Sequence, residues 1–145
     1  MKLMNLFWVL CLAVIATGCD DDNDNEENVN LLRGTTWECV KIMDIEADTI
    51  IPFAPIKAAD SYILKFVADS SQFFTKGAAN TIAGKYELDK ENIRLSINTF
   101  MTTIGIIGGD PFEEGFRAVD SYALKDDGLQ LFFNNKKGCL YFEKH

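Results

Sequence analysis

Histidine is almost absent from this 145-residue chain, and the one histidine, His145, is the last residue. Without an imidazole inside the chain, few of the acid–base pairs of hydrolases and no histidine-rich metal site can be built. We therefore expect a protein that is not an enzyme. We also expect no catalytic residues, no metal site and no cofactor.

Basic residues are scarce as well, with 14 Lys and Arg against 22 Asp and Glu and a formal net charge of −8. Nucleic-acid binding needs concentrated Lys and Arg that release counterions from phosphates, so we expect no nucleic-acid partner. The apolar fraction of 48% and the charged fraction of 25% are nevertheless ordinary for a globular protein. The length fits one domain of moderate size.

The apolar run near the N-terminus is too short to cross a bilayer. Leu6–Ala16 contains eleven apolar residues, whereas a membrane span needs roughly 20. Lys2 precedes this run and the small residues Thr17 and Gly18 follow it, a pattern that predicts a secretory signal peptide over residues 1–18. A buried N-terminal helix is the alternative, although the acidic run that follows would end such a helix abruptly.

The end of this segment, Ala16-Thr17-Gly18-Cys19, resembles the bacterial lipobox, with Ala16 where leucine is usual. The resemblance implies that Cys19 becomes the lipidated N-terminal residue, with a diacylglyceryl thioether and usually a third acyl chain. Two or more chains are enough for firm anchoring. We therefore expect the membrane to be a partner through the lipid on Cys19.

Residues 19–30 are predicted to be the lipidated cysteine and an acidic tether. Asp20–Glu27 contains six acids and no base, which repel one another and bury nothing. An acidic run behind the lipid cysteine resembles the surface-export signal of Bacteroidetes lipoproteins, which implies a surface-exposed outer-membrane lipoprotein. Asp20 directly after the cysteine also resembles the inner-membrane retention signal of enteric bacteria, so a periplasm-facing domain at either membrane is the alternative. A calcium loop matches poorly, since Asn25 stands where an EF-hand needs glycine.

The remaining residues, 31–145, carry 13 bases and 16 acids, so their net charge is only −3. Apolar residues alternate with polar ones in several short segments, which is typical of half-buried strands. Asp126-Asp127-Gly128 is a strong hairpin signal between two of these segments. The predicted strands lie at residues 35–43, 62–66, 72–76, 81–88, 93–97, 122–124, 129–133 and 140–142.

One late segment is predicted to be a helix of about ten residues. Asp110 is suited to the N-cap, Pro111 to the first helical position and Glu113 to the first turn. Phe112, Phe116 and Val119 would share one face. The fold class is therefore mainly β (α+β), a small antiparallel β-barrel or curled sheet of about eight strands with one short helix that closes one end.

Several short blocks of residues 31–145 resemble, in order, the META domain (HslJ-like) family. The blocks are Gly34–Glu38, Leu64-x-Phe66, Gly77–Asn80, Gly84-x-Tyr86, Asn98–Thr102, the helix with Glu114 and Phe116, Leu129-x-Leu131 and Leu140-x-Phe142. The resemblance implies an envelope or heat-shock association. Ala79, and Thr102 or Thr103, stand where the family often has cysteine, so no redox role is carried over.

Cys39 and Cys139 are the two thiols that remain after processing at Cys19. Two cysteines outside the cytoplasm favour a disulfide. Strand parity argues against one, because Cys39 shares its face with Trp37 whereas Cys139 alternates with the inward Leu140. The sequence does not decide between a disulfide and two free thiols.

Two apolar loop segments form a candidate partner surface. They pack over a barrel end, or they form an exposed patch that binds a partner. The residues concerned are Ile50, Ile51, Phe53, Ile56, Ile104, Ile106 and Ile107.

Together these patterns predict a lipid-anchored, non-catalytic binding or stress-related module of the cell envelope. Its partner would be a protein or a small apolar ligand. The alternative is a lipocalin-like carrier that holds a small apolar ligand inside the barrel. The volume of the interior cavity distinguishes the two, because a carrier needs several hundred Å³ and a module has a filled interior.

Overall fold

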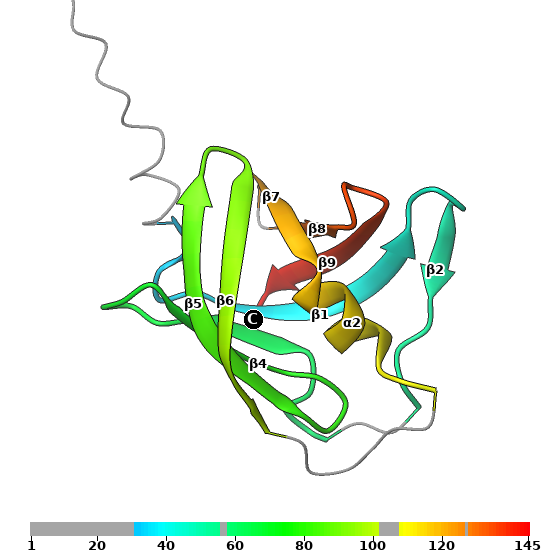
Figure 1. Ribbon diagram of the computed structural model, residues 1–145, viewed down its shortest axis with the longest axis horizontal. Helices are drawn as coiled ribbons and strands as arrows, with labels where there is room; N and C mark the ends of the chain where they lie inside the picture. The colour runs from blue at the N-terminus through cyan, green and yellow to red at the C-terminus, as the bar shows by residue number, and fades with distance from the viewer. Residues whose placement is uncertain (1–30, 56–57, 102–107, 127) are drawn as a thin grey trace, which may run out of the picture.

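The computed structural model describes residues 31–55, 58–101, 108–126 and 128–145. Nine strands form one antiparallel sheet in the order β2-β1-β3-β4-β5-β6-β7-β8-β9, and β1 also pairs with β9 (Figure 1). The strands are β1 (Thr36–Asp44), β2 (Thr49–Ile51), β3 (Ile63–Phe66), β4 (Gln72–Lys76), β5 (Thr81–Asp89), β6 (Asn92–Met101), β7 (Val119–Lys125), β8 (Gly128–Phe133) and β9 (Gly138–Lys144).

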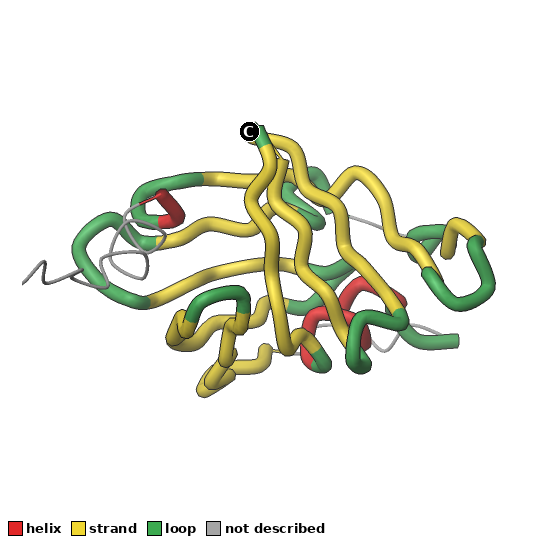
Figure 2. The backbone as a smooth tube through the Cα atoms, turned by 90° about the horizontal axis from the view of Figure 1, so that it is seen from above, coloured by secondary structure: helices red, strands yellow, loops and turns green. Residues whose placement is uncertain are grey.

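The pairings of β1 close the sheet into a barrel. On one side of β1, residues 36–38 pair with β3 and residues 42–44 pair with β2. On its other side, β9 pairs with β1 from Trp37 to Asp44. Eight strands therefore form a closed barrel and β2 lies outside it. This confirms the predicted small antiparallel barrel, whose curled wall is seen from above in Figure 2.

Alternation of side chains decides which face of each strand is buried, because successive residues of a strand point to opposite faces. In β8, Leu129, Leu131 and Phe133 are buried while the residues between them are partly exposed. In β4, Phe73 is fully buried and Phe74 is 47% exposed. The period-2 pattern thus places every second side chain of a strand inside the barrel and the side chains between them on its outer wall.

The sequence did not predict β2, which lies outside the eight strands of the barrel. The chain turns after β1 with Asp48 at a φ of 51°, a left-handed conformation that Asp tolerates better than most residues. Ile50 then pairs with Met43 near the end of β1. Three residues are too few for a period-2 signal, so only the pairing with β1 defines this strand.

The predicted helix is α2 (Pro111–Arg117), and its N-terminus is capped as expected. Asp110 Oδ1 accepts a hydrogen bond from the Phe112 backbone N–H at 3.0 Å. The helix has seven residues rather than about ten, because Val119 begins β7 and does not belong to the helix. Among the described residues, no helix has the length and apolar composition that crossing a membrane requires.

Aromatic rings of α2 fill the barrel interior. Phe112 and Phe116 stack at 5.7 Å between ring centroids. Phe116 contacts Phe73 of β4 at 5.4 Å, and Phe112 contacts Phe142 of β9 at 6.3 Å. Since β4 and β9 lie three strands apart around the barrel, these rings bridge its interior. Both helix rings are fully buried.

Candidate functional site

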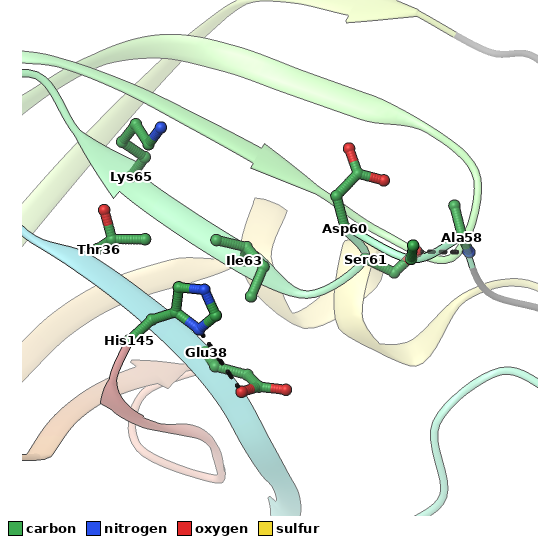
Figure 3. A pocket seen from close by; sticks show the side chains of 9 residues that line it. Thr36, Glu38, Ala58, Asp60, Ser61, Ile63, Lys65 and His145 are labelled. Atoms are coloured by element: carbon green, nitrogen blue, oxygen red, sulfur yellow. Dashed lines mark hydrogen bonds and ion pairs between the residues drawn. The ribbon is translucent and has the colours of Figure 1, made fainter.

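The largest hollows that the described residues form lie on the surface of the barrel, whereas its interior is filled. One of about 620 Å³ lies on the outer wall of β1 and β3 (Figure 3). β1 contributes Thr36 and Glu38, and β3 contributes Ile63 and Lys65. The segment 58–61 and His145 complete the lining. We call this surface the outer hollow.

The segment 58–61 is held rigidly as the rim of the outer hollow. Ser61 Oγ donates to the Ala78 carbonyl at 3.0 Å and accepts from the Ala58 N–H at 2.9 Å. Asp60 accepts a hydrogen bond from Lys76 Nζ at 2.7 Å. This bond is the main reason that the pKa of Asp60 lies below its usual value.

Tyr62 connects this rim to β3 with an unusual backbone conformation. Its φ is 69°, a left-handed value that a bulky residue adopts only where its surroundings enforce it. The Tyr62 N–H donates to the Lys76 carbonyl at 2.6 Å, and its carbonyl accepts from Cys39 at 2.9 Å. Its ring packs on Phe53 and Phe112 at 4.5 and 5.3 Å. Burial of the ring is the main cause that raises the pKa of the hydroxyl to about 12.

A second hollow of about 370 Å³ continues the outer hollow across β3. The two share Asp60, Ile63 and Lys65, and the second adds the exposed ring of Phe74 on β4. Together they form a groove with an apolar floor and charged rims. Such a groove can bind a ligand through apolar contact and hydrogen bonds.

A buried polar cluster joins α2 to the loop between β4 and β5. Asp110 Oδ2 accepts from the Ala78 N–H at 2.6 Å, and Glu113 Oε2 accepts from Asn80 Nδ2 at 3.1 Å. Burial is the main cause of the raised pKa of Glu113, whose Oε1 has no hydrogen-bond partner. A Cβ added to Gly77 would stand 2.5 Å from both carboxyl groups. The cluster is therefore tightly enclosed, and we assign it to holding the helix in place.

The thiols are buried, and the structure has no disulfide between them. Cys39 and Cys139 are both free. Burial raises the pKa of Cys139 to about 12 and raises that of Cys39 further. Cys139 lies on the outer face as parity predicts, yet it is fully buried there. Burial disfavours the thiolate, the nucleophilic form, at both positions.

Glu38 and His145 are two titratable residues that line the outer hollow. His145 Nδ1 lies 3.8 Å from Glu38 Oε2, and both side chains are 56% exposed (Figure 3). Among the described residues there is no cluster of three or more His, Cys, Asp or Glu that could hold a metal ion.

The structure places the predicted partner surface only in part. Ile50 is 68% exposed on β2. Ile51 and Phe53 pack against the core, so these two cover the barrel instead of forming an exposed patch. The other residues of this prediction, Ile56, Ile104, Ile106 and Ile107, lie outside the described residues, as does Cys19.

Sequence reasoning missed the outer hollow. Thr36, Glu38, Ile63 and Lys65 occupy outward positions that strand parity could have assigned. The pairing of β1 with β3 places them side by side, and no local pattern encodes it. The strained Tyr62, which projects the rim outward, also had no sequence signal.

Comparisons with known proteins support the fold and leave the family open. No protein-family model and no curated protein matches the sequence. The fold is similar to an NMR structure of a protein from Burkholderia xenovorans, with a TM-score of 0.61, 17% identity and coverage of 83% of this chain and 88% of that chain. It is also similar to the crystal structure of a DUF4847 family protein from Bacteroides vulgatus ATCC 8482, with a TM-score of 0.58, 17% identity and coverage of 78% and 94%. At this identity the likeness shows the barrel fold alone.

Proposed function

We propose that the protein is a lipid-anchored, non-catalytic binding module of the cell envelope. In this proposal Cys19 carries the lipid, residues 20–30 are the tether, and residues 31–145 form a META-like domain on the outer-membrane surface. The domain binds a protein or a small ligand through its outer wall. The resemblance to the META family supports a stress-related role.

The observation that carries this proposal is the filled interior of the barrel. Phe112 and Phe116 occupy the space between β4 and β9, where a carrier would hold its ligand. Among the described residues, Leu31, Trp37 and Leu124 line a hollow of only about 100 Å³, and ligand pockets usually measure about 300–1,000 Å³. The larger outer hollow, about 620 Å³, lies outside the barrel.

A fluorescence titration separates the module from the lipocalin-like carrier. The probe is cis-parinaric acid, an apolar fatty acid that becomes fluorescent when it is enclosed. We expect no saturable signal at micromolar protein. Stoichiometric binding that Phe112→Ala or Phe116→Ala strengthens would instead locate the ligand inside the barrel and contradict the module.

Fractionation of cells tests the anchor. Changing Cys19→Ala should move the protein from the membrane fraction to a soluble or uncleaved form, because the acyl chains supply the membrane affinity. Ser121→Ala serves as the control, since it leaves the lipobox intact. Unchanged detergent partitioning of the Cys19→Ala chain with Met1 still attached would contradict the anchor.

Crosslinking in intact cells tests the outer hollow. A photoreactive amino acid is placed at Lys65, in the hollow, or at the exposed Lys85 on β5 as the matched control. Lys65 should give one dominant crosslinked partner and Lys85 should not. Equal crosslinking from both positions would contradict the outer hollow as the binding surface.

A further inference from the structure

The barrel wall has its fewest paired residues between β6 and β7. Asn92 and Ser121 are the one residue pair that joins these strands, although β6 runs from Asn92 to Met101. The other edge of β6 pairs with β5 from Asn92 to Met101. Figure 1 shows β6 and β7 side by side at one end and separating from there toward α2.

The register shows which backbone groups of β6 have no partner among the described residues at this seam. Asp89 and Asn92 close the two-residue turn between β5 and β6, so Arg94 and Ser96, which precede the bulge, also bond to β5. Leu95 and Ile97 therefore direct their N–H and C=O groups to the opposite side, toward the seam. No described residue forms a hydrogen bond with either of them there.

The seam also has space beside this edge. A hollow of about 640 Å³ opens where the strands separate, lined by residues 92–95 of β6 and by Val119 and Asp120 of β7. The side chains of Leu95 and Ile97 pack against the core but stay partly exposed. An added strand could therefore cover apolar surface as well as complete the hydrogen bonds.

The charges around the seam are mostly negative. Glu87, Asp89 and Asp120 line the hollow together with one cation, Arg94. A second copy of this chain would bring two such acidic rims together, which like-charge repulsion disfavours. A segment with basic side chains is complementary to this rim.

We propose that the edge of β6 over residues 95–98 binds an extended, basic segment of another protein as an added strand. An unpaired edge is a template for an extended backbone, since strand addition supplies main-chain hydrogen bonds for affinity and side-chain pockets for specificity. Alternate apolar side chains of the segment enter the seam and the basic ones remain outside. This site is separate from the outer hollow and needs no lipid on Cys19, so either proposal can fail alone.

Amide hydrogen exchange in the free protein tests whether this edge of β6 is unpaired. In the full chain carrying Cys19→Ala, the amides of Leu95 and Ile97 should exchange quickly although they lie inside a strand. Those of Arg94 and Ser96, which bond to β5, should be protected by roughly tenfold or more. Equal protection at all four positions would show that the edge is already covered and would overturn the proposal.

Binding is tested with a synthetic heptapeptide, acetyl-Val-Lys-Val-Thr-Val-Lys-Val-amide. The control peptide has proline in place of its third and fifth residues, which removes the donors that strand addition needs. The first peptide should slow exchange at Leu95 and Ile97 roughly tenfold and shift the resonances of residues 95–98. Shifts confined to the outer hollow, equal effects of both peptides, no binding, or β6-mediated dimerisation of the chain would each overturn the proposal.

Two pairs of variants test the chemistry of the edge. Ile97→Ala and Ile97→Pro remove the same packing, but only the proline removes the free N–H, so only it should abolish peptide binding. Glu87→Lys should weaken binding about fivefold, as expected for one rim charge. Glu143→Lys, on β9 with the same change in net charge, should leave binding unchanged. Equal affinities within either pair would overturn the proposal, and urea midpoints confirm that each variant is folded.

Discussion

Asn80 and Glu113 lie 33 residues apart in the sequence and are joined by a hydrogen bond of 3.1 Å from Asn80 Nδ2 to Glu113 Oε2. The bond fastens the loop between β4 and β5 to α2. A second bond, from the Ala78 N–H to Asp110, fastens the same loop to the start of the helix. A seven-residue helix is not stable alone, so these bonds and the aromatic core define its position.

Glu113→Gln should stabilise the protein at neutral pH. Burial, and secondarily the charge of Asp110, raise the pKa of Glu113, while Asn80 and Arg117 act in the opposite direction. The native state therefore holds this proton more tightly than the unfolded chain does. The contribution of Glu113 to stability is full below its unfolded pKa and is lost as the pH rises through its folded pKa.

Glutamine keeps an acceptor for Asn80 and cannot ionise. The melting temperature of Glu113→Gln should exceed that of the parent near pH 7, and the difference should vanish by about pH 4. Glu114→Gln, on the exposed side of α2, is the matched control and should show no such pH dependence. A difference that grows as the pH falls would contradict the raised pKa.

Phe116→Ala should destabilise the protein by about 3–5 kcal/mol, through lost burial and the cavity left behind. The ring is fully buried and packs on Phe73 and Phe112. Glu114→Ala, on the same helix but exposed, should stay within about 0.5 kcal/mol. Urea midpoints measure both, and equal midpoints would mean that α2 is not docked through its phenylalanines.

Gly84→Ala should destabilise the hairpin of β5 and β6. A Cβ at Gly84 would stand 2.1 Å from the Ser96 carbonyl oxygen, so the two backbones must move apart at the bulge between Ala83 and Gly84. Overpacking of this kind costs roughly 1–3 kcal/mol. At Gly128 the nearest atom to an added Cβ is 3.4 Å away, so Gly128→Ala should be much milder in the same urea titration.

Cys39 and Cys139 should resist thiol reagents in the folded protein. Burial raises the pKa of both, to about 12 at Cys139, and the thiolate is the reactive form. In a chain carrying Cys11→Ala and Cys19→Ala, the disulfide reagent DTNB should modify them only after urea unfolding. Lys125→Cys in that background supplies an exposed thiol that should react at once. Rapid labelling of the parent would contradict this burial.

Replacing the six acids of Asp20–Glu27 with serine should alter surface display, measured by protease accessibility on intact cells. The melting temperature should stay unchanged, because a solvated acidic run buries nothing. Serine substitution of six acids within residues 31–145 would not be an equivalent control, because those residues belong to the predicted domain. The control is therefore a chain in which the residues of Asp20–Glu27 stand in a scrambled order. A drop of more than a few degrees on removing the acids would show that the tether packs against the domain.

Local residue patterns determined most of the elements by themselves. Alternation predicted the eight strands of the barrel, because a half-buried strand must place apolar residues at every second position. The observed β6, β7 and β9 extend beyond their predicted bounds. Asp110 and Pro111 predicted the start of α2, since they satisfy the backbone donors of its first turn. The acidic tether and the lipidation of Cys19 are also predictions from local sequence, and they stay predictions.

Only the tertiary structure decided what depends on contacts between distant residues. It paired the three residues of β2 with β1, buried Cys139 on an outward face, and placed Tyr62 in a left-handed conformation that its neighbours enforce. It also decided that Asn92 and Ser121 are the one pair of described residues that joins β6 to β7. The physical reason is that periodicity records which face of a strand is apolar, whereas strand neighbours and loop positions depend on packing across the whole barrel.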